Sequence, residues 1–298
     1  MVKLEVNSDF DRLDSFLISK VDKSRSKIQS MIKSGNIRVN GNVVKPSCYL
    51  HIGDIVEVDD VVEEVLSANP EKMDLDIVYE DDDVIVVNKA NGVVVHPAVG
   101  NNSGTLVNGL LYYSDSLSGV NGKFRPGIVH RIDAYTTGLL MVAKNDKAHD
   151  SLARQLEAKT TRRVYWALVW GVIPNDTGTI DAPIGRDIND RKKMCVTASN
   201  SKHAVTHFRV LERYKRATLI ELSLETGRTH QIRVHMNYIG YPIVNDPVYG
   251  RRKLIDNSGQ CLHAKTLGFI HPTTGKEMMF DSSLPDCFVN ILNMFKEE

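Results

Sequence analysis

The side chains best suited to chemistry lie in the stretch HRIDAYTTGLL, where Asp133 follows Arg131 by two positions. A Thr-Thr-Gly sequence comes next and leads into an apolar run, so the carboxylate is expected on a turn that enters a buried strand. A carboxylate in that position can act as a nucleophile or as a general base. The two residues can equally form a structural ion pair, and the tripeptide by itself fits both interpretations.

Two later blocks contain side chains that can act together with Asp133. Tyr165 lies in the strand-like block RRVYWALVWG, and Arg228 and Arg233 lie in LETGRTHQIRVHMNYIG. An aromatic face can stack on a nucleic acid base, and a guanidinium near a buried carboxylate favours the charged form of that carboxylate. Taken singly, Tyr165 fits a core position on a strand and Arg233 fits the exposed face of a helix. Trp166 is expected on the opposite face of the strand from Tyr165.

These three blocks, in this order, resemble the RluA/RluD-like family of RNA pseudouridine synthases, and the resemblance extends over essentially the whole chain. By that resemblance, Asp133 occupies the position of the catalytic aspartate in the motif HR-x-D. Arg233 corresponds to the arginine that pairs with this aspartate, and Tyr165 to the tyrosine that packs under the target base. Arg131 is expected to fill the gap left by the flipped base and to contact phosphates. Arg228 is expected to bind phosphate or to anchor a loop.

The resemblance implies an isomerisation that converts uridine to pseudouridine. The glycosidic bond breaks, the base turns while it stays bound, and it rejoins the sugar through carbon 5. The base must first be flipped out of its stack, at a cost of roughly a few kcal/mol. No redox cofactor, nucleotide triphosphate or metal ion is then expected. The sequence has no Gly-rich phosphate-binding motif, no H-E-x-x-H motif and no C-x-x-C pair among its four cysteines.

A short basic region near the N-terminus is the candidate RNA-binding surface. Between Lys20 and Lys45 the sequence has seven basic residues and one acid, although Lys+Arg and Asp+Glu are equal in number over the whole chain. Local clustering of positive charge suits phosphate binding whatever the net charge of the protein. The residues expected to contact RNA are Lys23, Arg25, Lys27, Lys33 and Lys45.

The same region has the pattern of a small folded unit. RLDSFLISKV fits one helix, and a second helix is expected between Ser24, a favourable N-cap, and Gly35. Its apolar residues Ile28, Met31 and Ile32 share one face. The strand-like segments IRVN and GDIVEV follow, and this order resembles the small RNA-binding domain found in a small-subunit ribosomal protein (S-four). The alternative is a solvated pair of amphipathic helices with ordinary surface lysines.

The composition reverses after this unit, which indicates a domain boundary. From Asp54 to Asp83 there are thirteen acids and one base, a charge that repels phosphates. The polar segment VEEVLSANPEKMD is the expected linker. A chain of 298 residues with 42% apolar content can form one large and one small domain. We therefore predict a small basic RNA-binding domain at residues 1–68 and a catalytic domain at residues 69–298.

The elements expected beyond the linker alternate in an α+β rhythm. Apolar periodicity predicts helices in SGTLVNGLLYYS and DKAHDSLARQLEAK, and strands in LDIVYEDDDVIVV, GLLMVAKN, RRVYWALVWG, KHAVTHFRVLER and ATLIELSLE. Another helix is expected in GRTHQIRVHMNYIG, with Gly227 and Thr229 suited to a capped start. The resemblance implies an α+β protein: a large mixed, mostly antiparallel sheet flanked by helices, with the active-site cleft across its face, and a small N-terminal α/β domain.

Some positions near the motifs have two interpretations or depart from the family pattern. Lys89 and His96 lie in a block shared with the family and fit either an RNA contact or a structural role. Ala134 and Tyr135 replace a charged pair that is common after the catalytic aspartate. Asn245 stands in a block where relatives commonly have Gly-Asp-Pro. We expect these departures to affect RNA contacts and substrate choice more than activity.

These observations favour a cytoplasmic RNA pseudouridine synthase that acts on structured RNA, with large-subunit ribosomal RNA as the expected substrate and no cofactor. The same chemistry on transfer RNA is one alternative. A non-catalytic RNA-binding ribosome-assembly factor is another, although loss of activity would most simply remove Asp133, Tyr165 or Arg233. A glycosidase with paired carboxylates is a weaker candidate, because one acid alone is embedded in a motif. The segment after Met1 is charged and no apolar run reaches about 18 residues, so we expect neither secretion nor a membrane span.

Overall fold

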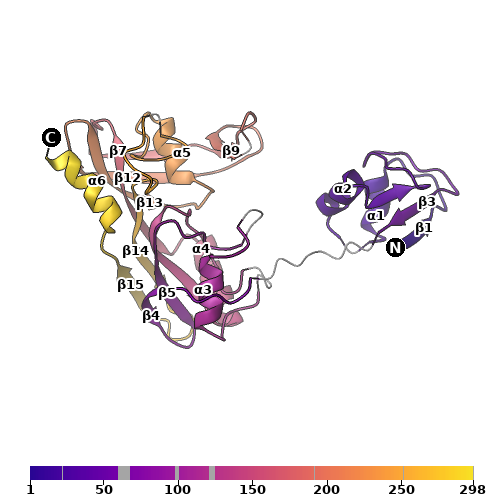
Figure 1. Cartoon of the computed structure of the whole chain (residues 1–298), viewed down its shortest axis with the longest axis horizontal. Coiled ribbons are helices and arrows are strands. Elements are labelled where there is room, and N and C mark those ends of the chain that lie inside the picture. Colours follow the sequence, from indigo (N-terminus) through magenta and orange to yellow (C-terminus); the bar gives the residue numbers. More distant parts are fainter. Residues whose placement is uncertain are drawn as a thin grey trace. The chain divides into compact units, whose positions relative to one another are not determined.

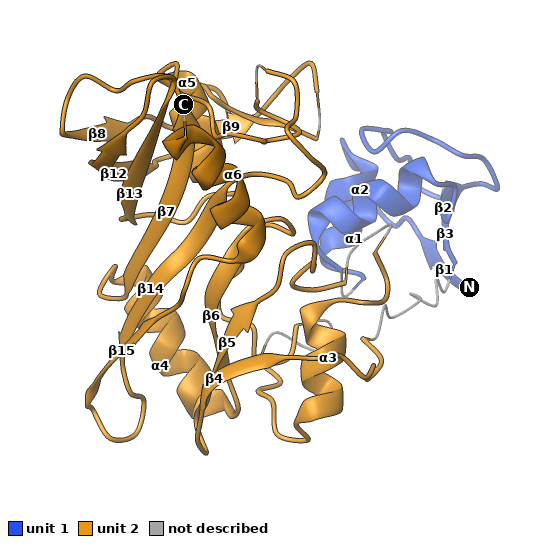
Figure 2. Cartoon of the chain, turned by 60° about the vertical axis from the view of Figure 1, so that its left-hand side comes forward, with its two compact units in different colours: residues 1–65 blue, residues 66–298 orange. Residues whose placement is uncertain are grey.

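The computed structural model describes residues 1–21, 23–59, 68–97, 101–120, 125–190, 192–250 and 252–297. The chain divides into two compact units, unit 1 and unit 2, at residues 1–65 and 66–298 (Figure 2). The predicted linker, residues 62–74, lies partly outside the described residues. Its described end belongs to unit 2, because Ala68 is part of that unit's core and the Asn108 side chain donates to the carbonyl oxygen of Asn69 at 2.7 Å.

Unit 1 packs two helices against a small antiparallel sheet (Figure 1). Its elements are α1 (Leu13–Ile18), α2 (Arg25–Lys33), β1 (Val2–Glu5), β2 (Ile37–Val39) and β3 (Ile55–Val58), with β3 between the other two strands. Ser24 caps α2 by accepting a hydrogen bond from the backbone amide of Lys27. Gly35 follows α2 with a φ of 78°, which glycine adopts readily. The predicted second helix is confirmed, whereas the sequence does not predict β1.

A carboxylate is buried where α1 begins. The side chain of Asp14 is 0% exposed; Arg12 Nε donates to its Oδ1 at 2.9 Å, and Gln29 Nε2 donates to its Oδ2 at 2.6 Å. Arg25 Nε lies 3.4 Å from Oδ2. The hydrogen bond from Arg12 outweighs desolvation and holds the pKa of Asp14 well below its usual range. Asp14 therefore joins the two helices of unit 1.

Unit 2 is built on a mixed sheet that has, within the described residues, the order β4-β5-β6-β14-β7-β13-β12-β8, with β15 paired to β14. Its neighbouring strands are antiparallel except β6 and β14, which are parallel. The strands are β4 (Asp76–Glu80), β5 (Val84–Lys89), β6 (Thr137–Ala143), β7 (Arg162–Trp170), β8 (Thr177–Asp181), β12 (Val205–Arg213), β13 (Ala217–Leu224), β14 (Leu262–Ile270) and β15 (Glu277–Asp281). The predicted large, mostly antiparallel sheet is confirmed.

A smaller sheet and helices complete unit 2. The smaller sheet has the order β10-β9-β11, from β9 (Ile184–Arg186), β10 (Met194–Val196) and β11 (Ser201–Lys202). The helices are α3 (Leu106–Tyr113), α4 (Asp146–Glu157), α5 (Gln231–Tyr238) and α6 (Asp286–Lys296). None of the helices in the described ranges is long and apolar enough to cross a membrane.

Both faces of the large sheet are covered by apolar packing. Consecutive residues of a strand point to opposite faces. In β6, Leu140 and Val142 join one core with α3 and α6, while Leu139 and Met141 join a second core with α4. Burial on both sides explains why every residue of β6 is buried and why the strand lacks a polar alternation.

Two features of unit 2 differ from the expectations. The sequence does not predict the strands β8 to β11, β14 and β15 or the helix α6. The start of α5 is not capped by Thr229, because the residue before the helix is His230, which has a left-handed φ of 56° and makes no side-chain cap. Instead, the Gln231 side chain accepts a hydrogen bond from the backbone amide of Arg228 at 2.9 Å. The predicted Thr229 cap is therefore wrong, since a side chain inside the helix binds the preceding loop.

Candidate active site

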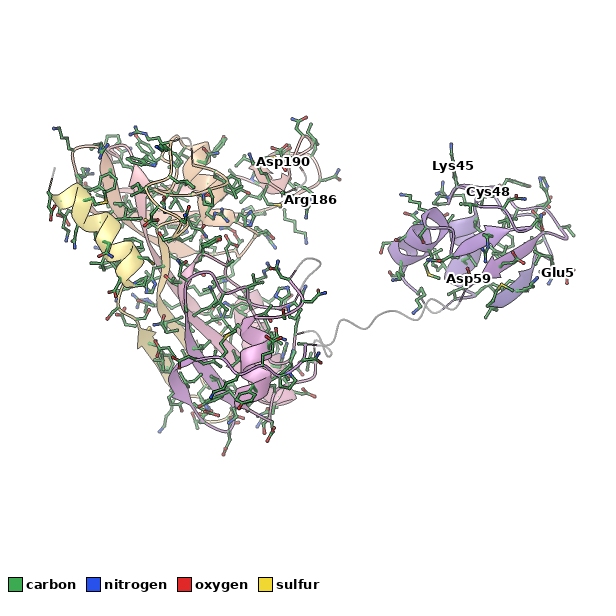
Figure 3. The ribbon with its side chains drawn as sticks, in the orientation of Figure 1. Glu5, Lys45, Cys48, Asp59, Arg186 and Asp190 are labelled. Atoms are coloured by element: carbon green, nitrogen blue, oxygen red, sulfur yellow. The ribbon has the colours of Figure 1, made fainter. Side chains whose placement is uncertain are left out.

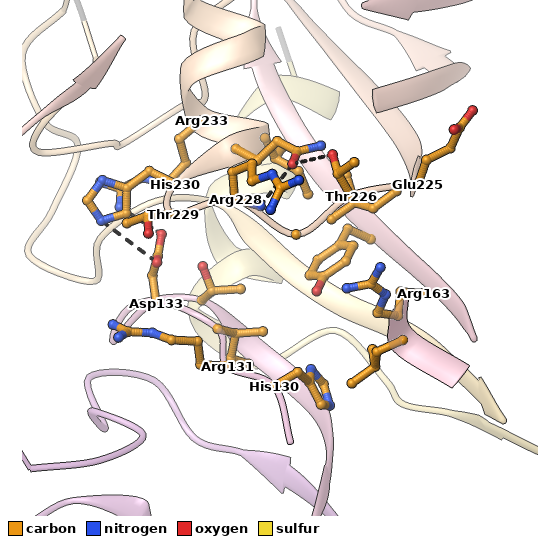
Figure 4. A pocket seen from close by; sticks show the side chains of 18 of the residues that line it. His130, Arg131, Asp133, Arg163, Glu225, Thr226, Arg228, Thr229, His230 and Arg233 are labelled. Atoms are coloured by element: carbon orange, nitrogen blue, oxygen red, sulfur yellow. Dashed lines mark hydrogen bonds and ion pairs between the residues drawn. The ribbon is translucent and has the colours of Figure 1, made fainter. Parts of the chain in front are cut away.

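A pocket of about 640 Å³ lies between the loop that precedes β6, the strand β7 and the start of α5 (Figure 4). Segments one hundred residues apart in the chain meet there. The pocket brings together the five site residues that the sequence predicts in unit 2. They are Arg131, Asp133, Tyr165, Arg228 and Arg233.

Arg233 joins two carboxylates from separate parts of the chain. Its Nη1 donates to Asp133 Oδ2 at 2.8 Å. Its Nε and Nη2 donate to the two oxygens of Asp246 at 2.7 and 2.9 Å, a bidentate pair that fixes the guanidinium. The side chains of Arg233 and Asp246 are 5% and 0% exposed, whereas that of Asp133 is 20% exposed. Asp246 thus holds Arg233 in place, and Arg233 presents one N–H to Asp133.

Asp246 and Arg233 both stay charged despite their burial. Burial raises the pKa of Asp246, but the hydrogen bonds and charge of Arg233 and the backbone amides of Tyr249 and Val248 hold it below its usual value. Burial likewise lowers the pKa of Arg233, and its carboxylate partners more than reverse that effect. A buried ion pair keeps its geometry when further hydrogen bonds satisfy its remaining polar atoms.

His230 faces the second oxygen of Asp133. Its Nε2 lies 3.8 Å from Asp133 Oδ1, and its Nδ1 lies 2.8 Å from the Tyr249 hydroxyl. That hydroxyl accepts the backbone amide of Met194 at 2.9 Å, so its own proton points to Nδ1 and the neutral ring carries its hydrogen on Nε2. Burial, opposed by the charge of Asp133, lowers the pKa of His230 and favours this neutral form. A separation of 3.8 Å is too long for a hydrogen bond, so Oδ1 stays open to a substrate.

Tyr165 lies on β7 and lines the pocket with a buried side chain. Burial raises the pKa of its phenol, which is therefore neutral at physiological pH. Trp166 does not line the pocket, and its ring lies 5.5 Å from Lys265 Nζ. Tyr165 is therefore the better candidate of the two for contact with a base, as the sequence predicts.

The comparison with known proteins identifies the family. The family model described as RNA pseudouridylate synthase matches residues 83–238, and the S4 domain model matches residues 11–56. The uncharacterized RNA pseudouridine synthase YlyB of Bacillus subtilis (strain 168) is 55% identical over 288 residues, which cover 96% of this chain and 95% of that protein. The chain belongs to the RNA pseudouridylate synthase family. The predicted enzyme class and the predicted RNA-binding domain are therefore confirmed.

Other relatives cover most of the chain as well. Proteins of Pseudomonas aeruginosa and Zymomonas mobilis, both named ribosomal large subunit pseudouridine synthase D, are 43% and 45% identical. They match 93% and 92% of this chain and 89% and 90% of their own lengths. Among solved structures, human RNA pseudouridylate synthase domain containing 1 superposes with a TM-score of 0.58 and 27% identity, over 76% of this chain and 96% of that chain.

Arg131 does not form the ion pair with Asp133 that its tripeptide allows. Instead, its Nη1 lies 3.2 Å from Nε2 of the buried His96. Burial, together with the charges of Arg131 and Arg125, lowers the pKa of His96 to about 4, so the neutral ring accepts the hydrogen bond. The exposed guanidinium of Arg131 is thus positioned at the pocket. Of the two roles that the sequence allows for His96, an RNA contact and a structural role, this contact supports the structural one.

Lys89 fixes the turn that carries Asp133. The residue is 1% exposed, and its Nζ donates to the carbonyl oxygens of Ala90, Val93 and Ala134 at 2.8, 2.9 and 2.8 Å. Burial, opposed by the charge of Asp133, lowers the pKa of Lys89 to about 7. The three carbonyls use all three protons of the ammonium group, which leaves none for RNA. Lys89 is therefore structural in this family member.

Two further predicted residues make contacts within the chain. Arg228 Nε donates to the carbonyl oxygen of His203 at 2.9 Å, which anchors a loop, and a contact of Arg228 with phosphate stays a prediction. Asn245 is 2% exposed and has a left-handed φ of 61°, a conformation that asparagine tolerates better than most residues. Its side chain binds the Gly259 carbonyl and the Ile255 amide within one loop. The amide of Asn245 is therefore used within the chain, and an effect of this residue on RNA contacts stays a prediction.

Four of the five candidate RNA contacts of unit 1 lie in α2 or just before it: Arg25, Lys27 and Lys33 are in the helix, and Lys23 precedes it. Lys45 lies in the loop between β2 and β3 (Figure 3). Lys27 is half-buried, and the other four are exposed. The match of the S4 domain covers all of them. Their contact with RNA stays a prediction.

Sequence reasoning missed three residues of the site. Asp246 and Tyr249 lie in NDPVYG, where an acid beside a proline and an aromatic residue in a turn were the available signals. Arg163 lies two positions before Tyr165 and lines the same pocket. The period of two along a strand was the signal for Arg163.

Proposed function

We propose that this pseudouridine synthase modifies uridines in structured large-subunit ribosomal RNA, with Asp133 as the catalytic carboxylate. Relatives at 43% and 45% identity carry the name ribosomal large subunit pseudouridine synthase D, which supports this substrate over transfer RNA. The S4 domain supports binding to RNA. We place the protein in the cytoplasm, where this RNA is made and modified in bacteria.

The coordination of Asp133 is the observation that carries the proposal. One of its oxygens is bound by Arg233 at 2.8 Å, and the other has no donor within hydrogen-bond distance among the described residues. Asp246 and Lys89 hold the arginine and the turn on either side. A carboxylate fixed at one oxygen and open at the other, in a pocket of about 640 Å³, is suited to react with a bound nucleotide.

In the proposed reaction the target uridine is flipped out of the RNA and stacks on Tyr165. Arg131 takes the place of the flipped base and contacts neighbouring phosphates. Asp133 either attacks the sugar or the base as a nucleophile or removes a proton from the sugar. In each route the bond between N1 and C1′ breaks, the base turns, a bond between C5 and C1′ forms, and the C5 proton is lost while N1 gains one.

We assign the two roles to the two domains predicted from the sequence. Residues 1–68 form the RNA anchor, whose exposed basic side chains on and beside α2 are suited to phosphate contacts. Residues 69–298 form the catalytic domain, which contains every residue that lines the pocket. The anchor supplies affinity for the RNA, and the catalytic domain supplies the chemistry.

Mapping pseudouridines over all cellular RNAs in a strain that lacks this gene tests the substrate. We expect one or more pseudouridines to disappear from large-subunit ribosomal RNA and to return when the wild-type gene is restored. A loss confined to transfer RNA would contradict the substrate and leave the chemistry in place. Unchanged modification in every RNA would contradict both.

A further inference from the structure

Arg163 lies in the pocket, and the reaction described above gives it no role. It precedes Tyr165 by two residues on β7, so the two side chains emerge on the same face of the strand. Both residues line the pocket. In Figure 4, Arg163 and Asp133 lie on different sides of that pocket. A base that stacks on Tyr165, with its sugar at Asp133, therefore extends toward Arg163.

Arg163 has no hydrogen bond or ion pair with any residue that the structure describes, and its Nε is buried. Glu225 lines the same pocket but is already bound by Lys159 at 3.1 Å and by His207 at 2.9 Å. A buried donor without an acceptor destabilises the fold, so its presence in a native protein requires an explanation. Nε is closed to a substrate, but Arg163 lines the pocket, so the two Nη groups of the same guanidinium can donate to a substrate oxygen.

A glycine provides the space for this guanidinium. A Cβ atom at Gly227 would lie 3.0 Å from Arg163 Nη1. The φ of Gly227 is not positive, so the close approach of the guanidinium, rather than backbone conformation, accounts for the glycine. The block GRTHQIR therefore makes room for Arg163 and also supplies Arg233.

The immediate neighbours of Arg163 do not neutralise its charge. His130 Nε2 accepts the backbone amide of Met141 at 3.1 Å, and burial, assisted by the charge of Arg163, lowers the pKa of His130 to about 3. The phenol of Tyr165 is also neutral, because burial raises its pKa. An unmatched guanidinium in a partly buried pocket stabilises an oxygen that develops negative charge.

We propose that Arg163 is a catalytic residue that binds the carbonyl edge of the uracil before and after the base turns. This inference rests on the proposed function, which places the base on Tyr165. Uracil has approximate two-fold symmetry about the axis through N3 and C6. A half-turn about that axis exchanges N1 with C5 and O2 with O4. A guanidinium beside the base therefore meets O4 before the turn and O2 after it, and it needs no movement to bind both.

The same contact stabilises the detached base. When the bond between N1 and C1′ breaks, its electron pair leaves with the uracil, and the negative charge is delocalised onto O2 and O4. Arg163 donates to the oxygen that faces it, O4 before the turn and O2 after it, and so stabilises the anion at both ends of the turn. C5 then bonds to C1′, its proton is released, and N1 takes up a proton, so no atom is gained or lost. Removing a donor aimed at such developing charge lowers a rate by about 100- to 1,000-fold.

The test compares single-turnover pseudouridine formation at saturating RNA by the wild-type protein, Arg163→Ala and Arg162→Ala. Total RNA from the deletion strain is the substrate. Arg162 is exposed and does not line the pocket, so its variant controls for the loss of one positive charge. We expect Arg163→Ala to lower the rate constant about 100-fold with unchanged RNA affinity, and Arg162→Ala to retain the wild-type rate. Ethylguanidinium should restore part of the lost rate, and sodium chloride at equal ionic strength should not.

A second variant displaces the guanidinium of Arg163 without removing it. Gly227→Ala pushes against the flexible end of Arg163, so it should lower the rate about 10-fold while the protein stays folded. This variant keeps the proposal testable if Arg163→Ala does not fold.

Three results would overturn the role of Arg163. A loss of RNA affinity at an unchanged saturated rate would indicate a phosphate contact instead. Equal rates in the wild type and in both the Arg163→Ala and Gly227→Ala variants would exclude any contact with the base. A loss that ethylguanidinium does not restore would indicate a structural role. Modification of transfer RNA instead of ribosomal RNA by the wild-type protein would contradict the proposed substrate alone, because total RNA contains both and the comparison at Arg163 remains valid.

Discussion

The tripeptide Arg-x-Asp occurs in both units, and its two copies have opposite surroundings. In unit 1, Arg12 binds Asp14 through its own Nε at 2.9 Å, and a glutamine binds the second oxygen. In unit 2, Arg131 contacts His96, and Asp133 is bound by an arginine one hundred residues away. Local sequence determines the partner of the first aspartate, and tertiary structure determines the partner of the second.

The two carboxylates also differ in how many of their oxygens are bound by donors within the protein. The side chain of Asp14 is 0% exposed, and both of its oxygens have donors within the protein. The side chain of Asp133 is 20% exposed, and Nε2 of His230 lies 3.8 Å from its Oδ1, beyond hydrogen-bond distance. A carboxylate that is satisfied on all sides stabilises a fold, whereas one that is fixed on one side and open on the other can react. Incomplete coordination, rather than the tripeptide, distinguishes the acid that we propose as catalytic.

Matched substitutions at the two aspartates should give the largest difference. Asp133→Asn keeps the size of the side chain and removes its charge, so the single-turnover rate of pseudouridine formation should fall by at least about 1,000-fold, with folding and RNA binding retained. Asp14→Asn should leave that rate at the wild-type value. Wild-type-like turnover by Asp133→Asn, or an equal loss in both variants, would remove the distinction between the two sites.

Asp246→Asn tests whether Asp133 depends on a partner that it does not touch. The substitution removes the negative charge that fixes Arg233, so the guanidinium can leave its position beside Asp133. We expect the rate to fall about 100-fold while RNA affinity stays unchanged, because a small displacement of a reacting group has effects of this size. Kinetics at saturating RNA measure the effect. A wild-type rate would mean that the Asp133 turn needs no support from Asp246.

Paired variants at Tyr165 test whether its ring stacks on the target base beside Asp133. Tyr165→Phe keeps the stacking face and should turn over at nearly the wild-type rate. Tyr165→Ala loses about 1–3 kcal/mol of stacking, which corresponds to a loss of about 5- to 150-fold. The same single-turnover assay applies to both variants. Equal losses in the two would indicate a role for the hydroxyl or for core packing.

Removal of residues 1–65 separates affinity from chemistry. RNA affinity should fall, and the slope of its logarithm against the logarithm of salt concentration should become shallower by about 0.7 to 0.9 for each lost phosphate contact. The rate constant at saturating RNA should stay unchanged, since all pocket residues remain. Filter binding at several salt concentrations measures the slope. An unchanged affinity and slope would show that the basic side chains of unit 1 are only a solvated face.

The smallest effect on activity, and a clear effect on stability, is expected at Asp14. Its pKa is held below the unfolded value of about 4, chiefly by the hydrogen bond from Arg12. An acid with a depressed pKa adds stability above its unfolded pKa and loses that stability as the pH falls toward the folded pKa. The difference in free energy of unfolding between the wild type and Asp14→Asn should therefore be full at pH 7 and shrink below about pH 4. Urea unfolding at both pH values measures it, and a pH-independent difference would contradict this origin.

The sequence predicts the parts of the site that a local motif encodes. Asp133, Tyr165 and Arg233 fall in three recognisable blocks, and the structure brings them into one pocket. The helix α2 also follows from local signals, because its N-cap and its buried apolar face depend on residues three or four positions apart.

The remaining parts depend on contacts that spacing along the chain does not contain. Lys89 reaches the carbonyl of Ala134 across 45 positions. The protonated nitrogen of His230 is determined by a hydroxyl and a backbone amide from two other segments. The start of α5 is mispredicted because Gln231, rather than Thr229, binds the loop amide. Each of these requires the folded arrangement of the chain.

The most direct test measures the pseudouridine content of large-subunit ribosomal RNA in strains whose chromosomal gene encodes Asp133→Asn or Asp14→Asn. We expect the sites that are missing in the deletion strain to stay missing with Asp133→Asn and to reach wild-type occupancy with Asp14→Asn, at matched protein levels. Wild-type occupancy with Asp133→Asn would contradict the claim that the open carboxylate of unit 2 performs the chemistry.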